Sequence, residues 1–561
     1  MKQPGRRGTR KSTAISRRNL LKYGFAGGGA LAMGGAGSII PQAVRAKGGG
    51  SFTSPPTTAF MDALPIAPIA TPSTAPLPQL SPSRIPPAVV NAYYELDTRE
   101  GLHKFHSQLP PTSIWGYNGI TPGPTIMSQA NTTTVIRFNN NLPAHDPVGI
   151  GLPITAVHRH GGFQAPEDDG YPFDFVNTGF HRDYVFLHPA IESLHWYHDH
   201  SIDITAENVY RGLAGFYLNF DEVDSIAGEL DLNPNALRLP GRMVTDGGVT
   251  TRKYDVALAF QDRTFDSNGQ LVYDSFSHNG FIGDKFVVNG AIQPFYNVEP
   301  RKYRFRFLNG SNARQYEFIL RDGKTGKLLS FDYIIGTDDR LFEHPLTNIE
   351  SFRIASSERV QCVIDFSKYA GKEILLVNRL DQTEGRKPNG IVSPGTPILK
   401  FVVSAAAVAD PSQVPATLRA IPDDERPANV LKQGVRVRRQ FDFGRGGGAW
   451  VINGELFDEN RISAKPVEDQ YEIWDLNAGG GWEHPVHIHL SNFFIISRDG
   501  KPPAPIEQGW KDVVVVGGDR GSVQVLIKFS GFRGKYVFHC HTVEHEDARM
   551  MANFEVQAKK P

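Results

Sequence analysis

The chain has 561 residues, 40% of them hydrophobic, with 56 glycines and 40 prolines. Lys plus Arg and Asp plus Glu each number 59, so a basic surface for nucleic acid or anionic membrane is excluded. The length predicts roughly two to four domains. Only two cysteines are present, which excludes a disulfide framework.

The N-terminus has the layout of a signal peptide. Eight Lys or Arg precede residue 23, an apolar Gly/Ala-rich stretch follows, and Ala43–Ala46 reads AVRA. Ser16–Lys22 reads SRRNLLK, which favours a twin-arginine signal over an ordinary one that happens to contain two arginines. We predict a signal peptide over 1–46, export of the folded protein and a periplasmic or extracellular location. No later apolar run is long enough for a membrane anchor.

Past the signal, residues 47–87 form a Pro/Gly-rich arm without amphipathic periodicity. The rest is dominated by short β-branched and aromatic runs such as TTTVIRFNNNLP and GSVQVLIKF, separated by turn residues, which predicts β-sandwiches or barrels. Breaks in this pattern suggest domains over 88–225, 226–405 and 441–561, with a linker over 406–440.

Ten of the 18 histidines fall into four compact groups. They are His158 and His160; His198 and His200; His484, His487 and His489; and His539, His541 and His545. Residues i and i+2 of a strand point to the same face, so each His-x-His pair presents two imidazoles together. Eight such imidazoles exceed the ligands of one ion and imply several metal ions between the first and last domains.

The second cysteine lies in the stretch VFHCHTVEHEDARMM, between His539 and His541. Cys540 therefore points to the opposite face, where it can bind a separate copper with His484, His545 and Met550. Two imidazoles, a thiolate and a weak axial Met make a blue-copper electron-transfer centre. Only the backbone would separate that centre from the histidine cluster. Cys362, in the apolar run RVQCVIDF, is predicted to be a buried structural thiol.

A simpler interpretation is also open. A zinc or cupin-type site would use one or two His-x-His pairs, and any single pair could be a satisfied core or surface feature. Either would leave most of the ten histidines unexplained, so the sequence favours copper.

These motifs resemble the multicopper oxidases. The resemblance rests on HGG after His160, WYHDH at Trp196–His200, HPVHIH at His484–His489 and HCHTVEHEDARMM at His539–Met551. Within the family the chain is most similar to the bacterial spore-coat laccase and bilirubin oxidase group, through WGYNGITPGPTI and ITAENVYRGLAG. The resemblance implies an all-β fold of three consecutive cupredoxin-like Greek-key β-barrel domains.

It also implies four copper ions: one type 1, one type 2 and two type 3. The implied ligands are His484, Cys540, His545 and axial Met550 for type 1; His158 and His487 for type 2; His160, His198 and His539 for one type 3 ion; and His200, His489 and His541 for the other. The implied reaction couples four one-electron oxidations to reduction of dioxygen to two waters. His545, whose ring edge faces the substrate cleft in relatives, would receive the electron.

Five further side chains lie near these ligands in the sequence. Asp169 and Glu546 match acidic positions of the group that supply protons, whereas Asp168 and Asp547 are expected to be surface charges. Trp482 stands where bilirubin oxidases carry a tryptophan, and packing beside the copper and electron transfer from a stacked substrate are equally open roles.

Arg159 lies between two implied ligands, where the family more often has an apolar residue, and its side chain is expected to face away from the copper. Met550 as axial ligand, where some fungal laccases have Leu or Phe, implies a moderate redox potential.

The expected activity is oxidation of a small phenolic or pyrrolic reductant by a monomer. A metallo-oxidase of Mn(II), Cu(I) or Fe(II) is the alternative. The chain has seven methionines without a Met-rich insert, which argues against a dedicated cuprous oxidase. A third interpretation is an electron carrier or structural cupredoxin, which would not need all ten histidines.

Overall fold

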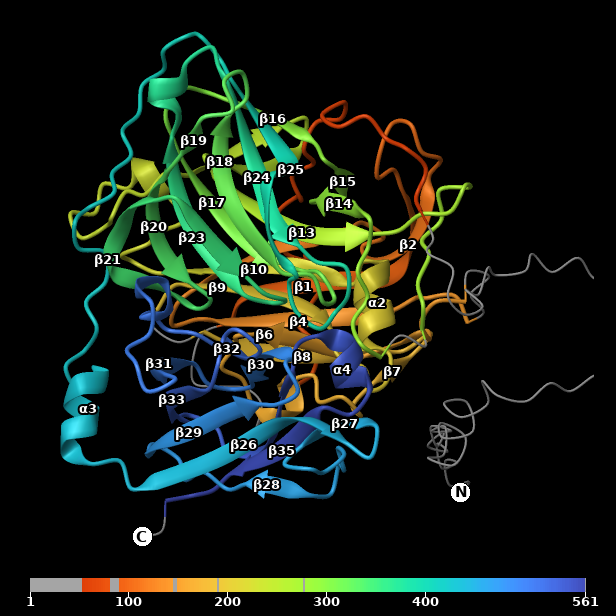
Figure 1. Ribbon diagram of the computed structural model, residues 1–561, viewed down its shortest axis with the longest axis vertical. Coiled ribbons are helices and arrows are strands. Elements are labelled where there is room, and N and C mark those ends of the chain that lie inside the picture. Colours follow the sequence, from red (N-terminus) through yellow and green to blue (C-terminus); the bar gives the residue numbers. More distant parts are fainter. Residues whose placement is uncertain (1–52, 81–89, 145–148, 189–190, 276–277, 560–561) are drawn as a thin grey trace, which may run out of the picture. The chain divides into compact units, whose positions relative to one another are not determined.

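The computed structural model describes residues 53–80, 90–144, 149–188, 191–275 and 278–559. The predicted signal peptide, 1–46, lies outside the described residues. Short strands dominate the described chain, and they group into three consecutive sets of sheets, drawn in orange to yellow, green and blue in Figure 1. The predicted all-β fold of cupredoxin-like domains is confirmed.

The first domain pairs two four-stranded sheets. One has the order β2-β1-β4-β8, with strands at Thr112–Tyr117, Val90–His103, Thr133–Asn140 and His181–Leu187. The other has the order β3-β10-β9-β6, at Gly123–Gln129, Ala214–Phe220, Ser193–Asp199 and Val157–His160. A two-residue pair, β5 (Ile154–Thr155) and β7 (Val176–Asn177), flanks them. Trp115, Tyr117 and Tyr197 fill the core between the sheets.

The second domain is larger. Its seven-stranded sheet, β15-β14-β13-β17-β23-β20-β21, has strands at Ala291–Ile292, Lys285–Val288, Asp255–Arg263, Lys302–Asn309, Arg359–Asp365, Phe331–Thr337 and Arg340–Ile349. The facing sheet, β16-β25-β24-β18-β19 with β22 paired to β18, has strands at Phe295–Val298, Gly390–Val403, Glu373–Asp381, Tyr316–Asp322, Leu328–Leu329 and Ser351–Ile354. The hairpin β11–β12 spans Arg242–Asp246 and Val249–Lys253.

The predicted buried thiol, Cys362, lies in this second domain on β23. It is fully buried in the domain core, as expected.

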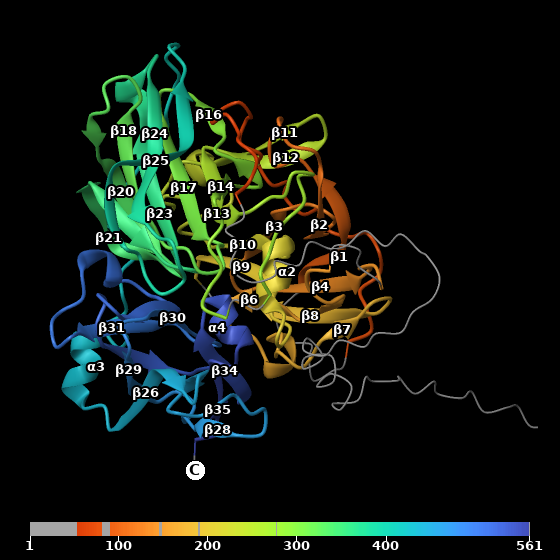
Figure 2. The ribbon, with the colours of Figure 1, turned by 45° about the vertical axis from the view of Figure 1, so that its right-hand side comes forward.

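Two five-stranded sheets make the third domain. The first, β27-β26-β29-β33-β31, has strands at Ala449–Ile452, Val437–Gly446, Tyr471–Ala478, Val523–Lys528 and Phe493–Arg498. The second, β28-β35-β34-β30-β32, has strands at Ile462–Ala464, Met551–Val556, Gly534–Cys540, Glu483–Ile488 and Val513–Gly517. Strand β26 begins inside the stretch expected to be a linker. In Figure 2 these blue strands lie below the green strands of the second domain.

Every residue of strand β30 is buried, and its alternate side chains point to two different buried faces. Val486 and Ile488 face the barrel core, while His487 faces the other way. Residue Val486 pairs with Cys540 on β34, and His487 pairs with His539. One face of this strand pair is therefore an apolar core, and the other carries histidines.

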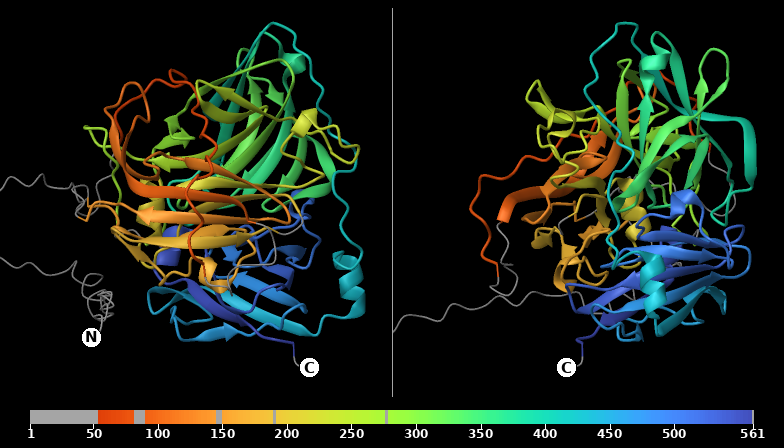
Figure 3. Two further views of the ribbon diagram at one scale, coloured as in Figure 1. Left: turned by 180° about the vertical axis from the view of Figure 1, so that it is seen from behind. Right: turned by 90° about the vertical axis from the view of Figure 1, so that its left-hand side faces the viewer.

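The described part of the arm, 53–80, packs along the domains rather than forming one (Figure 3, red). Ala63 forms a bridge with Phe295 of the second domain, and Ile69 forms one with Thr125 of the first. Leu64 joins the core of the second domain. The arm therefore contacts both domains.

The α-helices of the described chain are few and short: α2 (Thr205–Arg211), α3 (Pro427–Gln433) and α4 (Val543–Asp547). Among the described residues, none is long and apolar enough to cross a membrane.

Candidate metal centres

Two strand pairs bring eight histidines together. In the first domain β6 lies beside β9, with His158 opposite His198; in the third, β30 lies beside β34, with His487 opposite His539. The other four follow two residues later: His160 at the end of β6, and His200, His489 and His541 directly after β9, β30 and β34. All eight are at most 1% exposed. The predicted bridge between the first and last domains is thus present.

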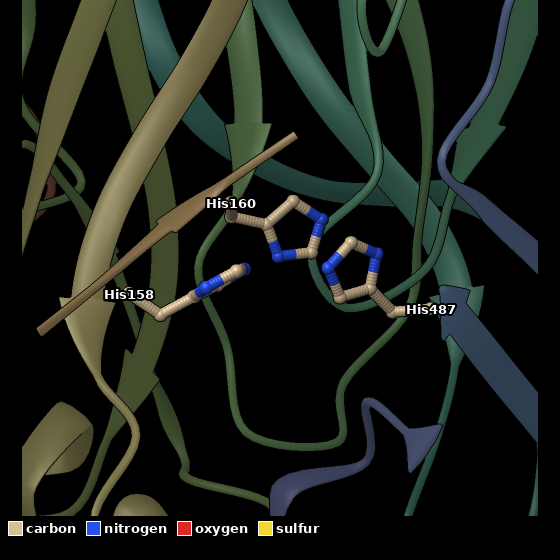
Figure 4. A group of neighbouring side chains, drawn as sticks. All are labelled: His158, His160 and His487. Carbon is tan, nitrogen blue, oxygen red and sulfur yellow. The ribbon is translucent and has the colours of Figure 1, made fainter. Parts of the chain in front are cut away.

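The ring nitrogens form three sets, within each of which the candidate ligand atoms lie within 4.8 Å of one another. The sets are His158, His160 and His487; His160, His198 and His541; and His200, His489 and His539. Figure 4 shows the first, with His158 and His160 from one strand facing His487. In the third set, His539 Nε2 lies 3.2 Å from His200 Nε2 and 3.3 Å from His489 Nε2.

The sets correct one expectation from the sequence. His541, not His539, lies with His160 and His198, and His539 lies with His200 and His489. Both histidines project from the same face of β34, so alternation cannot say which reaches which partner. How the first and third domains meet decides it.

Outer partners fix the ring orientations. His158 Nδ1 donates to the Asp169 carbonyl (2.6 Å), His487 Nδ1 to the Asp512 carbonyl (2.8 Å) and His198 Nδ1 to the Asp199 carbonyl (2.8 Å). The Nε2 atoms of these three histidines are buried without a hydrogen-bond partner. Buried unpaired nitrogens beside one another are costly unless they bind a ligand, and metal-binding histidines are usually held in this way.

Cys540 lies on the opposite face of β34 with a separate pair of histidines. Its Sγ is 3.4 Å from His484 Nδ1 and 3.5 Å from His545 Nδ1, and these nitrogens are 3.2 Å apart. The Thr542 amide donates to the sulfur (3.4 Å). Met550 is fully buried, and its carbonyl accepts from the Cys540 amide (3.1 Å). The donor set is the one that suits blue copper.

Burial gives the imidazoles the neutral state that a metal requires. Desolvation lowers the pKa of His484 to about 3 and that of His200 to about 4, so both rings are neutral at pH 7. Burial raises the pKa of Cys540 to about 12. A metal that binds there must displace the thiol proton. The residues therefore fit copper at both places.

Both predicted carboxylates lie at the cluster. Asp169 Oδ2 accepts from His489 Nδ1 (2.7 Å). Glu546, on α4, places its two oxygens 3.1 Å from His539 Nδ1 and 3.3 Å from His200 Nδ1. Each carboxylate thus contacts histidines on a different side of the cluster.

A third carboxylate, which no sequence motif predicts, also lies at the cluster. Asp512 Oδ1 accepts from His160 Nε2 (3.1 Å), and both its oxygens accept from the guanidinium of Arg359 at 2.5 Å. Arg359 belongs to β23 of the second domain, and both side chains are buried. An acid opening the apolar run VVVV was the only signal in the sequence.

Two tryptophans cover the Cys540 group. The ring centroid of Trp450 lies 3.9 Å from that of His545, and Trp482 lies 5.5 Å from it. His545 is fully buried, so the expectation that its edge is presented to substrate is wrong here. Trp450 comes from the hairpin β26–β27, whose proximity to His545 no local pattern reveals.

Two more expectations are wrong. Asp168 is buried, and its Oδ1 accepts from the Val185 amide (3.0 Å). Asp547 accepts from the amides of Thr205 and Ala206 in the first turn of α2 (2.9 and 2.8 Å). Asp168 is therefore not a surface charge, and Asp547, which is half-buried, satisfies two backbone donors at the start of α2.

Arg159 packs as expected, away from the histidine sets. Its guanidinium lies over the rings of Phe186 and Tyr217, 4.7 and 5.2 Å from their centroids.

Comparison with known proteins agrees with this geometry. Sequence profiles described as multicopper oxidase match residues 102–222 and 422–560. A bilirubin oxidase of Albifimbria verrucaria is 36% identical over 470 residues, covering 82% of this chain and 76% of that protein. A laccase of Bacillus subtilis (strain 168) is 32% identical over 556 residues, covering 89% and 98%.

Among solved structures, a laccase from Pediococcus acidilactici superposes with a TM-score of 0.71 at 26% identity, covering 91% of this chain and 96% of that one. The chain belongs to the multicopper oxidase family. It is an oxidoreductase, and its family uses copper, dioxygen and a reducing substrate.

Proposed function

We propose that the protein is a laccase-like oxidase that couples one-electron oxidation of phenolic or pyrrolic compounds to four-electron reduction of dioxygen to water. Four copper ions would supply the one-electron chemistry and the site for dioxygen. His484, Cys540, His545 and Met550 would hold the type 1 ion. The type 2 ion would be held by His158 and His487, and the type 3 ions by the sets around His541 and His539.

One observation carries this proposal: Cys540 is covalently joined to both His539 and His541. An electron carrier would need only the Cys540 group. Here the two neighbours of that cysteine belong to the two histidine sets assigned to type 3 copper. A short covalent path through the backbone therefore links Cys540, whose copper would accept the electron, to His539 and His541, whose copper ions would bind dioxygen.

Reduction of dioxygen at the histidine cluster also requires protons, and two carboxylates that contact the cluster can carry them. Glu546 contacts His539 and His200, and Asp169 contacts His489. Both carboxylates contact buried histidines of the cluster directly, so protons that reach the cluster would pass through them.

Oxygen uptake by the copper-loaded protein tests the proposal, with a diphenol, bilirubin or Mn(II) as sole reductant. We expect uptake with the organic compounds and no accumulation of peroxide. Uptake with Mn(II) alone would make the protein a metallo-oxidase instead. A blue protein that consumes no oxygen with any reductant would be an electron carrier.

Export by the twin-arginine route, a periplasmic or extracellular location and a monomeric state belong to the same proposal. The location rests on the SRRNLLK sequence alone. Replacing Arg17 and Arg18 by lysines should retain the protein in the cytoplasm, which fractionation of producing cells would measure.

A further inference from the structure

Two arginines from different domains lie against the tryptophans that cover His545. The Arg445 guanidinium, on β26, is 4.1 Å from the ring centroid of Trp450 and 5.4 Å from that of Trp482. The Arg386 guanidinium, from the second domain after β24, is 5.6 Å from the Trp482 centroid. Both arginines are exposed. Two positive charges therefore flank the indole of Trp482.

Neutral acceptors hold both arginines. Arg386 donates to the carbonyls of Gly480 and Gly481, and Arg445 donates to Asn279 Oδ1 and the Gly448 carbonyl. Gly480 and Gly481 both have a φ of 71°, a conformation that favours glycine and turns their carbonyls toward Arg386.

No carboxylate of the described residues lies within ion-pair distance of either guanidinium. Three other arginines of the third domain do have a carboxylate partner: Arg438 pairs with Asp475, Arg461 with Glu455 and Arg533 with Glu468. The charges beside Trp482 are therefore available to a bound anion.

Of the rings around His545, Trp482 is the accessible one. His545 is fully buried and Trp450 is 2% exposed, whereas Trp482 is partly exposed. An aromatic reductant that approaches from solvent meets Trp482 first, 5.5 Å from the His545 ring. Arginine beside an aromatic face recognises an anionic aromatic molecule through stacking and charge together.

We propose that Trp482, Arg386 and Arg445 form a docking site for anionic aromatic reductants, those carrying a carboxylate or sulfonate. The ring lies against Trp482 and the anion pairs with a guanidinium. This specificity rests on the proposed oxidase function, which it narrows to a substrate class. Neutral phenols lack the ion pair, and the two positive charges repel divalent metal ions.

The test uses a matched pair of reductants, 3,4-dihydroxybenzoate and its uncharged methyl ester. In the R386Q/R445Q variant we expect KM for the benzoate to rise about tenfold, with kcat and both constants for the ester within about twofold of wild type. The R438Q variant, which removes an exposed but paired arginine, should match wild type. The R386K/R445K variant should keep part of the preference. An equal rise in KM for both compounds would overturn the proposal, because it would show that the arginines only support Trp482.

A binding measurement keeps the docking site distinguishable from turnover. By calorimetry, naphthalene-2-sulfonate, which is not oxidised, should bind the copper-loaded wild-type protein about tenfold more tightly than the neutral sulfonamide. The double glutamine variant should lose the difference. If wild type shows this preference but consumes no oxygen, the oxidase function fails and the docking site stands. Equal binding of both compounds by wild type would overturn the docking site.

Discussion

The two metal centres are assembled in different ways. The Cys540 group takes all its candidate ligands from residues 484–550, within the third domain. The eight-histidine cluster takes four residues from the first domain and four from the third, and its Asp512 is clamped by Arg359 of the second. One centre therefore forms with a single barrel, while the other requires all three domains to meet correctly. A substitution at one centre should therefore leave the other centre intact.

The largest effect is expected for Cys540→Ser. A hydroxyl is a poor copper ligand, so the visible absorption of a blue copper should vanish and oxygen uptake should fall below detection. The cluster should keep its metal because its ligands are untouched, so copper analysis should find about three ions for every four in wild type. Loss of all copper would show that the centres are not assembled independently.

Glu546→Gln should slow dioxygen reduction without impairing electron acceptance. Glutamine preserves the shape but cannot carry a proton, and a positioned acid typically contributes about 10²-fold or more. Stopped-flow bleaching of the blue absorption by reductant should proceed at the wild-type rate, while its return in oxygen should be slow. Glu544→Gln is the control, since Glu544 on the same helix contacts Tyr273 and Asn312 instead. Slow bleaching would contradict this role.

Asp512→Asn should weaken the cluster alone. The change removes the ion pair with Arg359 that orients His160, and such partners typically matter by about 10–100-fold in metal affinity. Copper content should decline while the blue absorption persists. The double variant R359M/D512N avoids leaving a buried unpaired charge, and Asp499→Asn, an exposed carboxylate of the same domain, is the control. A parallel decline of the blue absorption would contradict the separate assembly of the two metal centres.

The smallest effect on either metal centre is expected for a substitution of Asp224, at the interface between the first and second domains. Asp224 forms two hydrogen bonds with Arg304 (2.8 and 2.7 Å). Burial alone would raise its pKa, but the guanidinium outweighs it and lowers the pKa below the usual value. A lowered folded-state pKa adds stability above about pH 4 and loses it as pH falls.

Asp224→Asn should therefore reduce the free energy of unfolding by about 3–5 kcal/mol at pH 7. The difference in free energy of unfolding between the variant and wild type should narrow as the pH falls below about 4 and Asp224 of the wild type becomes protonated. Urea denaturation at several pH values would measure it, with both metal centres intact in the folded variant. A gap that stays constant with pH would contradict the ion pair.

Much of the site follows from local pattern. Alternation along a strand places His487 and His539 on one face and Cys540 on the other, and two-residue spacing pairs the histidines. Alternation does not fix how strands from different domains face each other. For that reason no local pattern places His541 beside His160 and His198, and the expected assignment was wrong.

The sequence by itself determined the β-strand class, the four histidine groups along the chain and the donor types, because these depend on periodicity and side-chain chemistry. Only the tertiary structure decided which imidazoles converge, that Trp450 and Trp482 cover His545, and that Arg359 holds Asp512. Those contacts join residues far apart in the chain, and their positions depend on how the cores of three domains pack, which no local sequence pattern specifies.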